Sequence, residues 1–143
     1  MANTDNQPLT QIRPGAGLHN VGSYQVSGRP WLTSSAFTQD TTLTCSFPCV
    51  SKNITVVNKG TNTLRVSFGK DGAQGNDATK GHYITIPALT AGAIDNTFTF
   101  DVKCRKVYIT EPDLAAGSVE VYASLTGIHS GSMFELTGEG LDD

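Results

Sequence analysis

The chain has 143 residues, of which 38% are hydrophobic and only 16% are charged, and its formal net charge is −3 at pH 7. This length fits a single domain with one buried core, and the charged fraction is below the roughly 25% that is typical of soluble domains. A negative net charge with scattered lysines and arginines argues against nucleic-acid binding, which normally requires clustered basic residues.

The sequence contains no signal for membrane insertion or export. No apolar run approaches the roughly 20 residues that a membrane-spanning helix needs, and the first residues, MANTDNQPLT, lack the basic and apolar regions of a signal peptide. The three cysteines Cys45, Cys49 and Cys104 cannot all pair internally, which agrees with a reducing compartment. We therefore expect synthesis in a cytoplasm and no membrane partner.

The first 22 residues are polar and are interrupted by Pro8, Pro14, Gly15 and Gly17. A segment of this kind has too little apolar surface to fold alone. The sequence therefore predicts an extended N-terminal arm over residues 1–22 and a β-sandwich domain over residues 23–143. We expect the arm to become ordered on a neighbouring copy or another protein, most simply as a strand added to an exposed sheet edge. A terminus without such contacts is the alternative.

The start of the domain contains a short apolar pattern and the only tryptophan. Val21, Tyr24 and Val26 predict a short strand, and Pro30 is expected to interrupt the ladder before Trp31. A large aromatic ring in a chain with few aromatics is more often a packing anchor than a platform for a sugar. We expect Trp31 to be such an anchor.

The stretch NITVVNKGTNTLRVSF, from Asn53 to Phe68, predicts a β-hairpin. Its two arms alternate with the period of a pleated strand, and Asn58 to Asn62 supply residues that hydrogen-bond their own backbone in a turn. One face is apolar and the other is polar. The predicted apolar face holds Ile54, Val56, Leu64, Val66 and Phe68, and the opposite face holds Thr55, Val57, Arg65 and Ser67.

Strand signals recur along the rest of the chain at short intervals. Half-buried strands must close over one another, so the sequence predicts an all-β fold, an antiparallel two-sheet β-sandwich of jelly-roll or related Greek-key type. Eight or nine short strands are expected, with no helix beyond a single turn at Pro112 to Ala116. The further predicted strands are Leu43 to Phe47, His82 to Ile86, Thr97 to Val102, Lys106 to Thr110, Ser118 to Leu125 and Met133 to Thr137.

Two sets of residues could in principle bind a metal ion. In the hydrophilic loop from Lys70 to Gly81, Asp71, Asn76 and Asp77 are hard oxygen ligands, but their spacing lacks the regular alternation of a helix-loop-helix calcium site. This favours a solvated or partner-facing loop. Zinc could use the three cysteines with a histidine, but Cys104 has no paired ligand nearby in sequence, so free, buried thiols are predicted.

No pattern of catalytic residues is present, and the sequence predicts no enzymatic activity and no catalytic, cofactor-binding or metal-binding residues.

The one local basic cluster is Lys103, Arg105 and Lys106. In an extended segment, Lys103 and Arg105 would share a face and Lys106 would point away. The titratable residues considered for catalysis are His19, His82 and His129, with Asp95, Asp101, Glu111 and Asp113 as turn and strand-end carboxylates.

Several segments carry a family resemblance. They are HNVGSYQVSGRPWLTSS, FPCVSKNITVVNKGTNTLRVSF, FTFDVKCRKVYIT, VEVYASLTGI and MFELTGEGLDD. Over most of the chain, from about His19 to the end, the sequence resembles small virion structural proteins of tailed bacteriophages, notably those of marine hosts and cyanobacteria. These motifs are structural and include no active-site signature.

The resemblance implies a β-sandwich that coats or joins part of a virion. A capsid decoration (cement) protein is the first expectation, with a neck, tail or fibre-base component as the alternative. The expected partners are other copies of the chain, in a homotrimer, and the major capsid protein or another virion protein. A carbohydrate-binding module is a different possibility, in which Trp31, Tyr24, Tyr83 or Tyr122 would stack on a sugar from one exposed, concave face.

Overall fold

The computed structural model describes residues 17–25, 28–38, 41–70, 72, 81–89, 95–112 and 116–141. The regular structure of this part of the chain consists of eight strands, a four-residue helix and a short 3₁₀ helix. The elements are α2 (Gly22–Gln25), β1 (Pro30–Phe37), β2 (Thr42–Ser46), β3 (Cys49–Asn58), β4 (Leu64–Ser67), β5 (Ile84–Ile86), β6 (Thr97–Phe100), β7 (Lys106–Thr110), β8 (Gly117–His129) and η2 (Ser130–Ser132).

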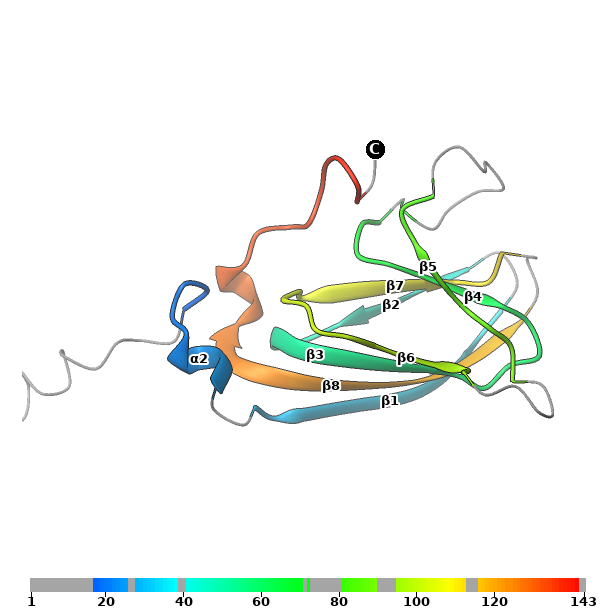
Figure 1. Ribbon diagram of the computed structural model, residues 1–143, viewed down its shortest axis with the longest axis horizontal. Coiled ribbons are helices and arrows are strands. Elements are labelled where there is room, and N and C mark those ends of the chain that lie inside the picture. The colour runs from blue at the N-terminus through cyan, green and yellow to red at the C-terminus, as the bar shows by residue number, and fades with distance from the viewer. Residues whose placement is uncertain are drawn as a thin grey trace, which may run out of the picture.

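The strands form two four-stranded antiparallel sheets that lie one above the other (Figure 1). Sheet A has the order β1-β8-β3-β6 and sheet B the order β2-β7-β4-β5. The first half of the chain pairs with the second half, because β1 lies beside β8, β2 beside β7, β3 beside β6 and β4 beside β5. A long antiparallel ribbon folded over itself in this way is a jelly roll. The predicted fold class is therefore confirmed.

The predicted hairpin is wrong as a pairing, although both of its arms are strands. β3 belongs to sheet A and β4 to sheet B, so the connection between them crosses from one sheet to the other. The predicted apolar faces are correct for Ile54, Val56, Leu64 and Val66, which are buried in one core cluster. Alternation shows that one side of a strand is buried against a facing sheet, but it does not show which strand lies beside it. For this reason alternation alone did not reveal the crossover.

The side chain of Asn58 fixes this crossover. Its Oδ1 accepts a 2.9 Å bond from the Gly60 backbone N–H, which is the local turn that the sequence predicts. Its Nδ2 donates to the carbonyl oxygens of Asn62 and Pro87, at 2.8 and 2.9 Å. Asn58 is fully buried, and these bonds join the end of β3 to the residue that follows β5.

The core lies between the sheets, and the half-buried aromatic ring of Trp31 packs against it. This ring packs edge-on against Phe47, with centroids 4.9 Å apart and an interplanar angle of 84°. The expectation of a packing anchor is confirmed. The thiols of Cys45 and Cys104 are buried in the same cluster.

Two predictions at the start of the domain are wrong. Residues 22–25 form the single turn of α2 instead of a strand, and Leu18 and Tyr24 pack against a second small cluster at the end of the sandwich. Pro30 does not interrupt a strand but begins β1. Because β1 is an edge strand, the missing N–H of proline costs no ladder bond there. The second cluster consists of Val50, Ile128 and Met133.

The C-terminal segment also differs from the prediction. Residues 133–137 follow η2 as irregular chain and do not form a strand, because side-chain contacts hold them in place of a backbone ladder. In β8 the regular pattern continues further than predicted, to His129. None of the helices in the described residues is long and apolar enough to span a membrane.

Two predicted features lie outside the described residues. Residues 1–16 of the predicted arm are among them, as is most of the possible helical turn after Pro112. The described remainder of the arm, from Gly17, packs on the domain itself, where Lys103 Nζ donates a 3.4 Å bond to Leu18 O. Contacts of residues 1–16 with a neighbour stay a prediction.

Candidate interaction surface

The outer side of sheet A is an exposed surface with few charges, which we call the open face. Along β8 the inward residues Val121 and Ala123 are buried, whereas Glu120 and Tyr122 point outward and are exposed. The same alternation on β1 leaves Leu32 exposed. Two cross-strand rows make up the open face: Leu32, Tyr122, Thr55 and Thr99, and Ser34, Glu120, Val57 and Thr97.

Apolar side chains line a shallow groove of about 320 Å³ on the open face, between β1, β8 and β3. Leu32 is 73% exposed and Tyr122 is 40% exposed, and Val57 lies on the same groove. Exposed apolar groups that gather on one patch mark interaction surfaces more often than single scattered ones do. Tyrosine is also enriched in the buried centres of protein interfaces.

Glu120 is the one charged residue in the two rows of the open face. Its Oε1 lies 4.0 Å from Lys59 Nζ, and both side chains are about half exposed, so this pair contributes little to stability. The remaining polar groups are hydroxyls, of which Thr55 Oγ1 and Thr99 Oγ1 share a 2.9 Å hydrogen bond. Depletion of charge is typical of the centre of a protein interface, because charged groups are costly to desolvate.

The outer side of sheet B has a different character. Lys70, Lys106 and Tyr108 line a polar cleft there together with Thr42 and Thr44. Tyr108 points outward, because its neighbours in β7 are fully buried in the core, and yet it is only 8% exposed. The C-terminal segment rises on this side of the molecule in Figure 1, and none of the described segments lies below sheet A in that view.

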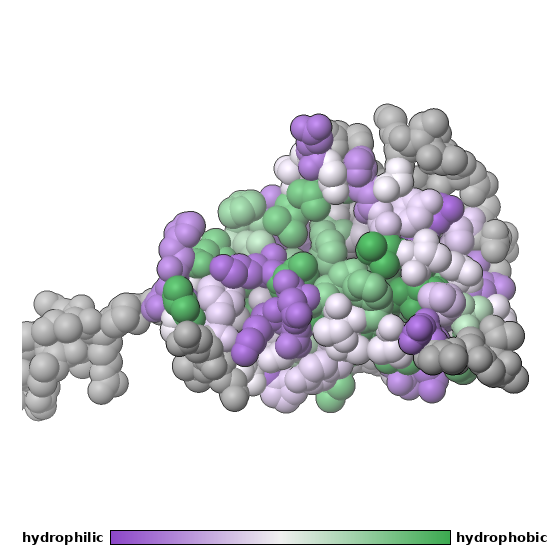
Figure 2. Space-filling view, viewed as in Figure 1, coloured by the Kyte–Doolittle hydropathy of each residue, from purple (hydrophilic) through white to green (hydrophobic). Residues whose placement is uncertain are grey.

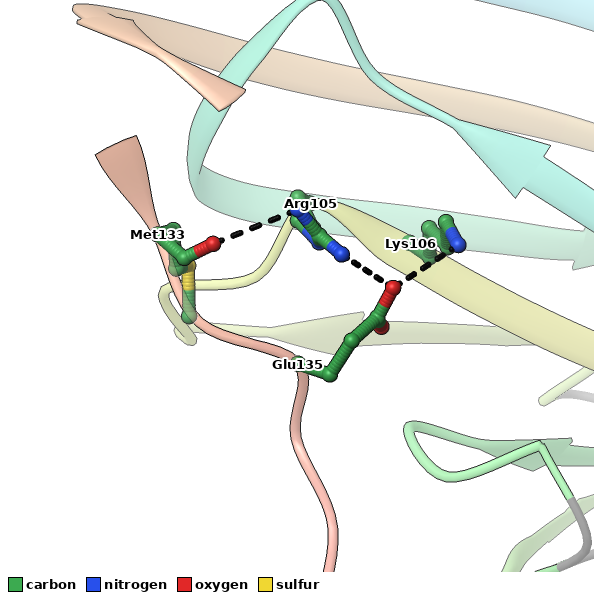
Figure 3. A network of polar contacts seen from close by, with 4 residues as sticks. All are labelled: Arg105, Lys106, Met133 and Glu135. Atoms are coloured by element: carbon green, nitrogen blue, oxygen red, sulfur yellow. Dashed lines mark hydrogen bonds and ion pairs between the residues drawn. The ribbon is translucent and has the colours of Figure 1, made fainter. Parts of the chain in front are cut away.

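Arg105 and Lys106 hold this C-terminal segment through one carboxylate (Figure 3). Arg105 donates to Glu135 and, at 3.3 Å, to Met133 O, and Lys106 Nζ lies 3.0 Å from Glu135 Oε1. The hydrogen bond from Arg105, and next the one from Lys106, lower the pKa of Glu135. The prediction that Arg105 and Lys106 point to opposite sides is therefore wrong. The chain crosses between the sheets here, so the period of a strand does not apply.

The third member of the basic cluster, Lys103, faces another part of the chain. Its Nζ lies 4.0 Å from the centroid of the Tyr24 ring. A shallow groove at this end of the sandwich is lined by Leu18, His19 and Val21 together with these two residues. The basic cluster is thus divided between two internal contacts.

The three cysteines are free thiols in the structure and form no disulfide. Burial raises the pKa of Cys45 to about 11. Burial also raises the pKa of Cys104 to about 11, against the opposing hydrogen bonds from Ser51 and from the backbone of Lys106. Such thiols are protonated at neutral pH and react slowly. Cys49 is only partly buried.

The candidate catalytic residues do not converge. His19 is exposed beside α2, His82 precedes β5, and His129 ends β8, where its Nδ1 accepts a 3.0 Å bond from the Gly131 N–H. No group of three or more possible metal-ligating side chains occurs within the described residues.

The described carboxylates lie at the predicted strand ends, and one of them is unexpectedly buried. Asp95 and Asp101 are exposed on either side of β6, whereas Glu111 directly after β7 is only 3% exposed. Its burial has no signal in the local sequence. Asp113 and the possible calcium ligands Asp71, Asn76 and Asp77 lie outside the described residues.

The four aromatic residues considered for sugar binding do not share a face. Trp31 packs into the core, Tyr24 lies under Lys103, and Tyr83 lies 4.4 Å from the Arg65 guanidinium on the side of sheet B. Only Tyr122 is on the open face. Sequence reasoning named Tyr122 for a different role and did not predict β1, so it missed the open face. The available signal in the sequence was weak, because PWLTSSAF has small polar residues at both inward and outward positions.

Comparison of the chain with protein-family models, with curated proteins and with solved structures finds no match.

Proposed function

We propose that this chain is a non-enzymatic structural protein of a bacteriophage virion, a decoration (cement) protein that binds the assembled capsid shell through the open face. The virion setting comes from the resemblance of the sequence segments. The mode of binding comes from a single observation, the exposed outer side of sheet A, whose two cross-strand rows contain one charged residue, Glu120. A neck, tail or fibre-base component would use the same surface on a different virion protein.

The chemistry of the open face favours a protein partner over a small molecule. Its groove is shallow and is lined by Leu32, Val57 and Tyr122, with Glu120 as the one charged residue of the lining. Small-molecule sites are usually concave and contain several converging polar groups. A broad, flat, low-charge surface is better suited to another protein surface, and many copies on a repeating lattice gain avidity without any strong single contact. The separated positions of the four aromatic residues give no support to sugar binding.

The experiment is a comparison of two charge substitutions in the full chain. Tyr122→Glu adds a charge at the centre of the open face, and Thr44→Glu adds the same charge on the outer side of sheet B. Each tagged variant would be produced during infection by the phage that encodes the chain, and its amount in purified virions would be measured by quantitative mass spectrometry.

We expect the native chain and Thr44→Glu in virions at similar copy number, and Tyr122→Glu reduced by about tenfold or more, because a buried unpaired charge costs several kcal/mol at an interface. A native chain that is missing from purified virions would refute the proposal. Equal incorporation of the two variants would show that the open face is not the docking surface.

A further inference from the structure

We infer that the free edge of β1 pairs with β1 of a second copy, so that two copies of sheet A join into one continuous antiparallel sheet. This inference goes beyond the proposed function and stands without it, since it concerns the purified chain alone. β1 is an edge strand of eight residues. The other edge strands are shorter, with five residues in β2, three in β5 and four in β6.

The register of β1 on β8 shows which backbone groups face outward. The N–H of Leu125 donates a 2.8 Å bond to Arg29 O, and Pro30 lies opposite Ser124 in the next pair. In an antiparallel ladder, hydrogen-bonded pairs alternate with pairs that do not exchange bonds. The backbone groups of Trp31, Thr33, Ser35 and Phe37 therefore bond to β8, and those of Leu32, Ser34 and Ala36 point to the free edge.

These three residues are accessible. Their side chains are exposed on the outer side of sheet A. Within the described residues, the hydrogen bond made by their outward backbone groups is a marginal one, which Ser35 Oγ donates to Ala36 O over 3.5 Å. Pro30, which has no N–H to offer, also falls on the outward set and lies at the end of the strand. Unpaired N–H and C=O groups in a row are a template for another strand.

Natural edge strands are usually protected by charged residues, prolines or bulges. β1, with the sequence PWLTSSAF, contains no charged residue, and its one proline is at the first position. No register shift interrupts its pairing with β8. The shorter edge strands β2, β5 and β6 are uncharged as well, so β1 differs from them in the length of its unprotected edge. A long edge without protection is the one expected to be covered in an assembled state.

A second copy is the occupant that fits this edge. A two-fold axis through Ser34 would place Ser34 opposite itself and Leu32 opposite Ala36 of the second copy, and all of these residues have outward backbone groups. The pairing places the 73% exposed Leu32 beside a small side chain. Because the strand is uncharged, two copies meet without like-charge repulsion, although the chain carries a net charge of −3. Two-fold contacts are also the commonest in homo-oligomers.

This pairing gives a dimer, or an assembly of dimers, in place of the homotrimer predicted from the sequence. The two open faces would then lie on one continuous surface. Such a surface doubles the area offered to a partner without adding a new kind of contact.

The test uses position 34, which the two-fold axis places opposite itself. Ser34→Lys and Ser34→Glu each bring two like charges together, so each variant alone should dimerise about tenfold or more weakly than the native chain. An equimolar mixture of the two variants should recover the dimer, because lysine then faces glutamate. Thr99→Lys, on the same face but on the opposite edge strand β6, is the matched control and should dimerise normally.

Sedimentation equilibrium of the purified full-length chain gives the measurement, with far-ultraviolet circular dichroism to check that each variant is folded. A monomeric native chain would overturn the inference. An oligomer that survives Ser34→Lys would also overturn it and would place the contact elsewhere, as in an exchange of N-terminal arms. Failure of the mixture to recover the dimer would exclude the two-fold axis at Ser34.

Discussion

The outer sides of the two sheets are built on the same strand alternation but differ in what covers them. On sheet B, Arg105 and Lys106 hold Glu135, and a Cβ placed at Gly72 would lie 2.5 Å from Leu141 O, so the chain itself occupies this side. On sheet A, Leu32 and Tyr122 remain exposed. Figure 2 shows that hydrophobic side chains also gather across the middle of the face seen there, which views the sandwich as in Figure 1.

The two outer sides therefore differ in how much of their surface the chain itself covers. On the outer side of sheet B, the basic residues Arg105 and Lys106 bind a carboxylate of the chain itself, in the segment that follows β8. The neutral side has no such internal partner among the described residues. An apolar surface that stays exposed is the better candidate for contact with other molecules.

The largest expected effect separates the inner and outer sides of sheet A. Ile54 is fully buried, and Thr55, the next residue of β3, is on the open face. Ile54→Ala should lower the free energy of unfolding by about 2–5 kcal/mol through lost burial and a residual cavity. Thr55→Ala removes one exposed hydrogen bond and should cost about 1 kcal/mol or less. Urea unfolding measures both.

Similar losses of unfolding free energy for these two variants would mean that the open face itself stabilises the fold. It would then no longer be available as a surface whose main role is contact with a partner.

A smaller effect is expected on sheet B, where Glu135→Gln would weaken the hold on the C-terminal segment. Hydrogen bonds from Arg105 and Lys106 lower the pKa of Glu135 below the usual value of 4.5. Its contribution to stability is therefore present above about pH 4.5 and is lost as the pH falls through the lowered pKa. The native chain should unfold at a slightly higher temperature than Glu135→Gln at pH 7, and this difference should vanish in acid and shrink in high salt.

Glu139→Gln, in the exposed turn near the C-terminus, is the control and should leave the unfolding temperature unchanged. A difference between native chain and Glu135→Gln that persists at pH 2 would show that the effect does not come from the charge of Glu135.

Much of the fold could be predicted because burial of one side of a strand leaves a direct mark on the sequence. Lys106 to Thr110 is a strand with the predicted bounds, and Ile54, Val56, Leu64 and Val66 are inward as predicted. Ser67, which was predicted on the polar face of the second arm, is buried instead. Which strands pair was not predictable from these marks. Asn58 bonds to Pro87 O, a residue 29 positions away, and no local pattern indicates such a contact.

The candidate surface was harder to predict than the core. β1 has small polar residues at the inward positions Thr33 and Ser35, so its alternation is weak, and Pro30 suggested a break. Around Met133, alternating residues suggested a strand, although contacts with Arg105 hold the segment instead. An exposed surface gives a weaker pattern in the sequence than a core does, because the fold does not require apolar residues there.

The central claim is tested most directly in the virion to which we propose that the chain belongs. A cryo-electron microscopy map of the virion, at a resolution that separates the two sheets, would show which side contacts the neighbouring protein. We predict that sheet A faces the partner, with Tyr122 and Leu32 in the contact, and that sheet B and the segment around Glu135 face solvent. A map in which sheet B makes the contact and the open face is turned to solvent would contradict the claim.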